Sequence, residues 1–128
     1  MTTLNLIKNS IEKFSQRNAF TINNENFNYL KLAQIISNIR KEINNKCSQQ
    51  EKLIGLITSN NDDIYTYSSI YASLFAGKGY VPINQKNPYD RNLSVIKQTN
   101  IKTILASKIN DDIKKLIDNE NLNVIMTS

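Results

Sequence analysis

The stretch Leu53-Ile54-Gly55-Leu56-Ile57 is a continuous apolar run of strand length, and the polar segment Thr58–Asp63 follows it directly. An apolar run without alternation is typical of a strand that is covered on both faces, as in a parallel sheet. The polar segment contains good helix caps, and its acids suit the positive end of a helix dipole. The stretch therefore predicts a buried strand followed by a helix.

Downstream of this stretch, helix and strand patterns keep alternating. Gly77 is well placed to stop the first helix, and Pro88 suits the first turn of the next one. Because proline cannot donate to a hydrogen-bond ladder, Pro82 places its strand at an edge of the sheet or at an early strand end. The predicted elements are a helix over 62–76, a strand over 80–83, a helix over 89–100, a strand over 102–106, a helix over 111–118 and a strand over 123–126. The alternation predicts an α/β layered domain with a largely parallel sheet flanked by helices.

The helical spacing of apolar side chains predicts which faces are buried. In the helix over 89–100, Leu93 and Ile96 share the inner face with Lys97, whose stem is expected to snorkel. In the helix over 62–76, the residues expected to be buried are Ile64, Tyr67, Ile70, Tyr71 and Leu74.

Upstream, the chain begins with an amphipathic pattern and a small hairpin. The β-prone runs Ala19–Ile22 and Phe27–Tyr29 flank four Asn and Glu residues, and Asn tolerates the left-handed backbone of tight turns. One face of a helix is predicted by Leu4, Ile7, Ile11 and Phe14. A second and clearer amphipathic helix is predicted by Leu32, Ile35, Ile36, Ile39 and Ile43.

Length and composition bound the function. The 128 residues suit a single domain over 1–128. The chain has no His, which excludes Ser–His and Cys–His catalysis and imidazole metal ligands. A single Cys excludes an internal disulfide and a thiolate zinc cage. Three Gly, none in a phosphate-cradling array, leave most routes to a complete active site closed.

Charge and hydropathy limit the partners. The net charge is +5, but the basic residues are scattered and the doublet Lys114-Lys115 has Asp111, Asp112 and Asp118 around it. Nucleic-acid binders usually concentrate basic residues on one face, so no nucleic-acid partner is expected. No apolar run approaches the length of a membrane span, and no membrane partner is expected. The unpaired Cys fits a reducing compartment, which predicts a cytoplasmic protein.

Several residue groups could carry chemistry, and each has a structural alternative. Gly77-Lys78-Gly79 follows a helix and precedes a strand, the reverse of a phosphate loop, so a helix stop is favoured. For the acid pairs Asp62-Asp63 and Asp111-Asp112, helix capping is favoured over cation binding.

The remaining candidates are a thiol, two hydroxyls and an aromatic group. Cys47 is interpreted as an incidental surface thiol. Ser68-Ser69 lack a basic partner for nucleophilic catalysis. Tyr65, Tyr67 and Tyr71 could stack a base, but Tyr67 and Tyr71 fit a core or an interface better.

Two segments nevertheless carry a resemblance to a known family. They read FNYLKL at 27–32 and LFAGKGYVPIN at 74–84, and PYDR follows at 88–91. They resemble the first two core motifs of adenylate-forming enzymes, roughly L-[TS]-Y-x-E-L and L-K-A-G-x-A-Y-V-P-[IL]-D, with P-x-[DE]-R a few residues later. This superfamily includes acyl-CoA synthetases, nonribosomal-peptide adenylation domains and D-alanine–carrier-protein ligases. The amino-acid-activating branch looks closest, and the resemblance covers about Ile11 to Ala106.

The motifs depart from the family pattern at several positions. Asn28 stands where Thr or Ser is usual, Lys31 where Glu is usual, and Asn84 where Asp is usual. Phe75 replaces the usual lysine, and Gly79 replaces the usual alanine. These departures blur the subfamily and leave the predicted fold, a partial N-terminal domain of an adenylate-forming enzyme, unchanged.

The resemblance also implies what this chain lacks. In the family, the Gly-rich phosphate loop, the adenine-binding and magnesium-binding segments, the ribose-binding Asp and the catalytic Lys lie downstream of these motifs. The resemblance therefore assigns no catalytic, cofactor-binding or metal residue here. It implies ATP and Mg²⁺ as cofactors of the complete enzyme only.

Three hypotheses follow. The first is the N-terminal portion of an adenylate-forming ligase, cut or truncated, whose partners would be the remainder of the enzyme or a carrier protein. The complete enzyme would activate a carboxylate, by resemblance an amino acid, as an acyl-adenylate and pass it to a carrier-protein or CoA thiol. The alternative is a standalone, non-catalytic interaction or oligomerisation module that hides its apolar surface in a homodimer. The third is a small nucleotide-binding α/β protein.

Overall fold

The computed structural model describes residue 9, residues 18–22 and residues 24–128, and the helix predicted from Leu4 to Phe14 lies outside these described residues. Helices and strands alternate from residue 29 onward, as the sequence predicts. The elements are β1 (Asn18–Ile22), β2 (Glu25–Asn28), α2 (Tyr29–Lys46), β3 (Leu53–Thr58), α3 (Ile64–Phe75), β4 (Gly79–Asn84), α4 (Tyr89–Thr99), β5 (Thr103–Ala106), α5 (Asp111–Glu120) and β6 (Asn123–Met126).

In the described part of the chain, the main sheet has four strands in the order β4-β3-β5-β6, and all of their pairings are parallel. A helix connects each strand to the next, which is the usual way to join parallel neighbours. Among the described strands, β4, which contains Pro82, pairs with β3 alone and is an edge strand, as predicted. The fold class expected from the sequence is therefore confirmed.

The predicted hairpin forms a separate two-stranded antiparallel sheet of β1 and β2. Ile22 pairs with Glu25, and Asn24 in the turn has a φ of 64°. The left-handed conformation is one that Asn tolerates better than most residues. The predicted second strand extends one residue too far, because Tyr29 begins α2 after Asn28 caps it: the Asn28 side chain accepts a hydrogen bond from the Lys31 amide.

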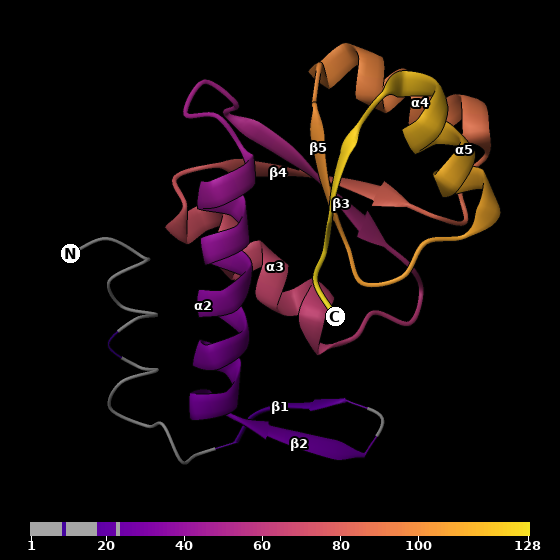
Figure 1. Cartoon of the computed structure of the whole chain (residues 1–128). Helices are drawn as coiled ribbons and strands as arrows, with labels where there is room; N and C mark the ends of the chain where they lie inside the picture. The colour runs from indigo at the N-terminus through magenta and orange to yellow at the C-terminus, as the bar shows by residue number, and fades with distance from the viewer. Residues whose placement is uncertain (1–8, 10–17, 23) are drawn as a thin grey trace.

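Each face of the main sheet carries its own core (Figure 1). Helices α2 and α3 cover one face, and the predicted apolar stripe of α2 is fully confirmed as buried. Helices α4 and α5 cover the other face, where Ile57 and Ile83 of the strands pack under Ile96 and Ile113. Strand β3 is thus covered on both sides, as its continuous apolar run predicts.

The predicted buried face of α3 is partly wrong. Ile64 is buried, but Tyr67 and Leu74 are each 37% exposed. Small residues fill the face instead, namely Thr66, Ser68, Ser69, Ala72 and Ser73. They sit where α3 packs between α2 and the sheet, and bulky side chains would hold these elements apart. Hydroxyl bonds to the preceding turn, from Ser69 to the Tyr65 carbonyl and from Ser73 to the Ser69 carbonyl, lower the cost of burying serine.

The inner face of α4 also differs from the prediction, at Lys97. Lys97 does not snorkel on the inner face; it is exposed and lies 3.6 Å from the Glu120 carboxylate. Asn92 is buried instead, and its side-chain amide donates to the Asn84 carbonyl at 3.0 Å. This bond ties the first turn of α4 to the end of β4. Apolar periodicity cannot identify such a buried polar anchor.

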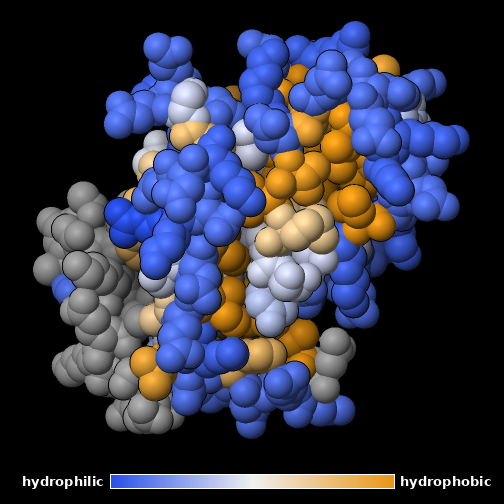
Figure 2. Space-filling model, viewed as in Figure 1, coloured by the Kyte–Doolittle hydropathy of each residue, from blue (hydrophilic) through white to orange (hydrophobic). Residues whose placement is uncertain are grey.

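Strand β6 forms the second edge of the sheet within the described part of the chain. Figure 1 looks onto this edge, with α2 on one side of β6 and α4 and α5 on the other. In the same view, Figure 2 shows apolar surface gathered in the strip between these helices. Met126, the last residue of β6, is 50% exposed. Among the described helices, none has the length and hydropathy of a membrane span.

Candidate functional site

The strand order places the topological switch point of the sheet between β3 and β5. The chain leaves β3 toward β4 on one side and returns to β5 on the other. In open α/β sheets, ligands bind outside the carboxyl ends of the strands at such a point. The loops that meet there are residues 59–63 after β3 and residues 107–110 after β5.

The space between these loops is small. Its volume is about 20 Å³, close to what one water molecule needs. A nucleotide needs a pocket of roughly 300 Å³ or more. The cavity is lined by Ile57, Ser59, Asn61, Asp62, Asp63, Thr66, Gln85, Ser107 and Lys108. The switch point is therefore closed to a ligand of that size in this conformation.

The acids at the switch point are engaged in local hydrogen bonds. Asp63 caps α3: its Oδ1 accepts from the Thr66 amide at 3.0 Å and from the Thr66 hydroxyl at 3.2 Å. Its Oδ2 accepts a hydrogen bond from the Ser107 hydroxyl. The Oδ1 of Asp62 accepts from the Ser59 amide at 2.7 Å. The capping interpretation is thus confirmed for Asp63, while Asp62 fixes the loop before the helix.

The second acid pair has the same structural character. Asp111 and Asp112 occupy the first turn of α5, where acids favour the helix dipole, but the capping side chain is Asn110. Asn110 accepts from the Ile113 amide at 2.9 Å. Within the described ranges, no group of three or more His, Cys, Asp or Glu residues could hold a metal ion.

Gln85 closes the switch point from the β4 side. Its side-chain amide donates to the Lys108 carbonyl at 3.0 Å, and its Oε1 accepts from the Asn110 amide at 2.8 Å. The Asn110 side chain returns a bond to the Gln85 carbonyl at 3.2 Å. These bonds join the loop after β4 to the loop after β5. These three hydrogen bonds indicate that the two loops form a structural junction.

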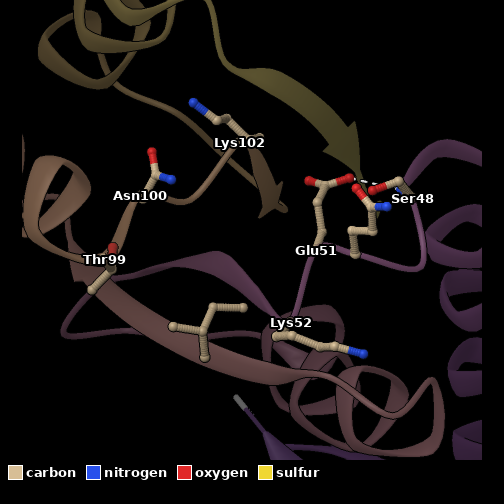
Figure 3. A pocket seen from close by; sticks show the side chains of 8 residues that line it. Ser48, Glu51, Lys52, Thr99, Asn100 and Lys102 are labelled. Atoms are coloured by element: carbon tan, nitrogen blue, oxygen red, sulfur yellow. Dashed lines mark hydrogen bonds between the residues drawn. The ribbon is translucent and has the colours of Figure 1, made fainter.

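A depression larger than the switch-point cavity lies at the opposite end of the sheet (Figure 3). Its volume is about 420 Å³, and it lies between the loop before β3 and the loop before β5. Figure 3 shows the Lys52 and Lys102 ammonium groups pointing away from each other, so they do not converge on one ligand position. The lining residues are Ser48, Gln50, Glu51, Lys52, Leu53, Thr99, Asn100 and Lys102.

A buried cation lies behind this groove. Lys78 is 8% exposed, and its Nζ donates to the Ser48 carbonyl at 2.9 Å and to the Glu51 carbonyl. The Glu51 carboxylate accepts from the Ser48 amide at 2.8 Å and from the Thr103 hydroxyl at 2.7 Å. The network joins the loop after α2, the turn after α3 and the start of β5. The polar groups of Lys78 and Glu51 therefore serve to hold these three segments together.

The Gly77-Lys78-Gly79 segment behaves as the helix-stop interpretation predicts. Gly77 has a φ of 77°, and its amide bonds to the Leu74 carbonyl. The Lys78 amide bonds to the Ser73 carbonyl, which completes the end of α3. The Lys78 side chain is directed to backbone carbonyls, so it is not available as a phosphate ligand. Sequence reasoning missed this anchor, because a Lys between two Gly has no apolar pattern that signals burial.

Cys47 is the C-cap of α2 and lies beside the Lys78 network. The prediction of an incidental surface thiol is wrong in part, because Cys47 is half-buried. Burial raises the pKa of the Cys47 thiol, and the nearby Glu51 carboxylate adds to this rise. A hydrogen bond with Thr103 and the charge of Lys78 act in the opposite direction. The net rise favours the neutral thiol, which is a poor nucleophile.

The serines and tyrosines of α3 form no catalytic arrangement in the described structure. Ser68 is fully buried, and its hydroxyl has no hydrogen-bond partner among the described residues. Tyr65 and Tyr71 are partly buried against the core under α2. Tyr67 is on the exposed side of the helix. The three rings are therefore split between the core and the surface.

No protein-family model matches the sequence, and no curated protein sequence matches it either. Solved structures do match. The Klebsiella oxytoca NpsA N-terminal subdomain has a TM-score of 0.79 and 14% identity over 98% of this chain. The nonribosomal peptide synthetase FmoA3, in its AMPPNP-bound form, has a TM-score of 0.78 and 17% identity over 98% of this chain.

An artificially fused adenylation–PCP di-domain, NpsA-ThdA from Klebsiella oxytoca, matches with a TM-score of 0.77 and 15% identity over 98% of this chain. The chain spans 31% of the NpsA subdomain chain, 22% of the fused protein and 13% of FmoA3. The likeness shows that the chain has the fold of the N-terminal part of an adenylation domain.

Proposed function

We propose that the chain serves as the N-terminal scaffold of an adenylate-forming ligase. The observation that carries the proposal is the agreement of two independent features. The described topology matches an adenylation-domain subdomain over 98% of this chain, and the sequence separately carries the family-like segments 74–84 and 88–91. Segment 74–84 spans the end of α3 and all of β4, and segment 88–91 opens α4.

The motif residues described next have structural roles in this fold. Gly77 ends α3 in a left-handed conformation, Lys78 anchors the turn, and Pro82 fixes the edge strand. Pro88 precedes the first turn of α4 and its carbonyl accepts from the Arg91 amide. None of these groups is free to stabilise charge on a reacting phosphate. Their role in the proposal is to shape the domain that presents the chemistry.

The complete enzyme, in this proposal, joins a carboxylate to ATP with release of pyrophosphate, and then passes the acyl group to a thiol with release of AMP. An amino acid is the proposed substrate class, and a carrier protein or CoA is the proposed acceptor. The AMPPNP-bound FmoA3 structure supports a nucleotide substrate, and the fused adenylation–PCP di-domain supports a carrier-protein partner. Mg²⁺ would spread the charge on the transferred phosphate. A cytoplasmic location belongs to the same proposal, in line with the single Cys.

Two measurements test the proposal. The reading frame downstream of the Ser128 codon should continue into a Gly-rich loop that ends in Pro-Lys-Gly, and a stop codon at that point would contradict the ligase scaffold. The 128-residue chain should show no carboxylate-dependent exchange of pyrophosphate into ATP. Robust exchange by the chain alone would show that it carries the catalytic groups itself.

One observation favours the second candidate function, a standalone interaction or oligomerisation module. Among the described residues, no strand pairs with the outer edge of β6, and this strand carries the exposed Met126 beside the apolar strip of Figure 2. In a larger adenylation domain, this edge would be covered by a further part of the same polypeptide. In a standalone module, it would be covered by a partner.

A further inference from the structure

We draw no further inference here: the strongest candidate, the groove between the loop before β3 and the loop before β5, carries no proposal, because its Lys52 and Lys102 ammonium groups diverge and its Glu51 carboxylate is already bonded within the fold, so that nothing in the structure shows which ligand would occupy it.

Discussion

Asp63 and Ser107 lie 44 residues apart in the sequence, and the Ser107 hydroxyl donates a hydrogen bond to the Asp63 carboxylate. The same carboxylate caps α3 through the Thr66 amide. One side chain therefore fixes the start of α3 and ties it to the end of β5 across the switch point of the sheet. A position that binds ligands in many α/β proteins is used here for a structural junction.

Replacement of Asp63 should be costly. Asp63→Ala removes the cap of α3 and leaves the Ser107 hydroxyl without its acceptor, so the free energy of unfolding should fall by about 1–3 kcal/mol. Urea denaturation measures the change. Asp112→Ala is the control, because Asp112 acts on α5 only through the helix dipole. This variant should lose less unfolding free energy than Asp63→Ala. Equal losses in the two variants would show that the junction with Ser107 contributes nothing.

Among the lysines at the amino end of the sheet, Lys78 should cause the largest loss of stability when it is replaced. Lys78→Met keeps most of the side-chain volume but removes the donors to the Ser48 and Glu51 carbonyls. The expected loss is about 1–3 kcal/mol of unfolding free energy, since buried acceptors lose their partner. Lys102→Met, at an exposed lysine beside the same groove, should be close to neutral. If Lys102→Met is the more harmful change, the anchoring role of Lys78 is wrong.

Gly77 should tolerate Asn better than Ala. No atom lies within 4 Å of a Cβ placed on Gly77, so the cost of a substitution comes from its φ of 77° and not from a clash. Gly77→Ala should lose about 1 kcal/mol of stability. Gly77→Asn should lose less, because the chain already places Asn at positive φ at Asn24, Asn100 and Asn121. Thermal unfolding of the two variants measures the difference, and an Ala variant at least as stable as the Asn variant would contradict the backbone explanation.

The Cys47 thiol should make stability fall at alkaline pH. Its pKa is raised in the folded chain, chiefly by burial, so the folded state holds the thiol proton more tightly than the unfolded state. The stabilisation is fully present below the thiol pKa of the unfolded chain. It is lost as pH rises from that value through the higher folded pKa, because the unfolded state then binds fewer protons.

A comparison with Cys47→Ala isolates this contribution. The difference in unfolding free energy between the native chain and the variant should be constant near neutral pH and should shrink toward alkaline pH. Alkylation of Cys47 by iodoacetamide should also be slower in the folded chain than in urea. A difference that grows with pH would mean that the pKa of Cys47 is lowered on folding.

The local patterns of the sequence were enough to predict most of the elements. Strand β6 begins and ends where its apolar run predicts, and the stripe of Leu32, Ile35, Ile36, Ile39 and Ile43 is buried throughout. Pro82 predicted the edge position of β4, and Gly77 predicted the end of α3. These features follow from backbone dihedrals, proline chemistry and hydrophobic period, all of which are local properties.

The candidate sites were predictable mainly by exclusion. The absence of His and of a glycine-rich loop ruled out several chemistries, and the acids after β3 were correctly interpreted as structural at Asp63. The role of Gln85 was not predictable, since its bonds reach Lys108 and Asn110 in another loop. Nothing local distinguishes a glutamine that crosses between loops from one that faces solvent.

The sequence by itself determined the order of the helices and strands, the parallel character of the sheet and one of its edges. The tertiary structure alone decided that α3 buries serines while Tyr67 and Leu74 stay exposed, because the spacing between α2 and the sheet sets the size of side chain that fits. It also decided that Lys78 and Asn92 are buried, since their acceptors come from segments that meet only in the folded chain. The period of apolar residues is a property of a single helix or strand, so it can be read from the sequence. The burial of a polar side chain depends on hydrogen-bond partners from other segments, which only the fold brings together.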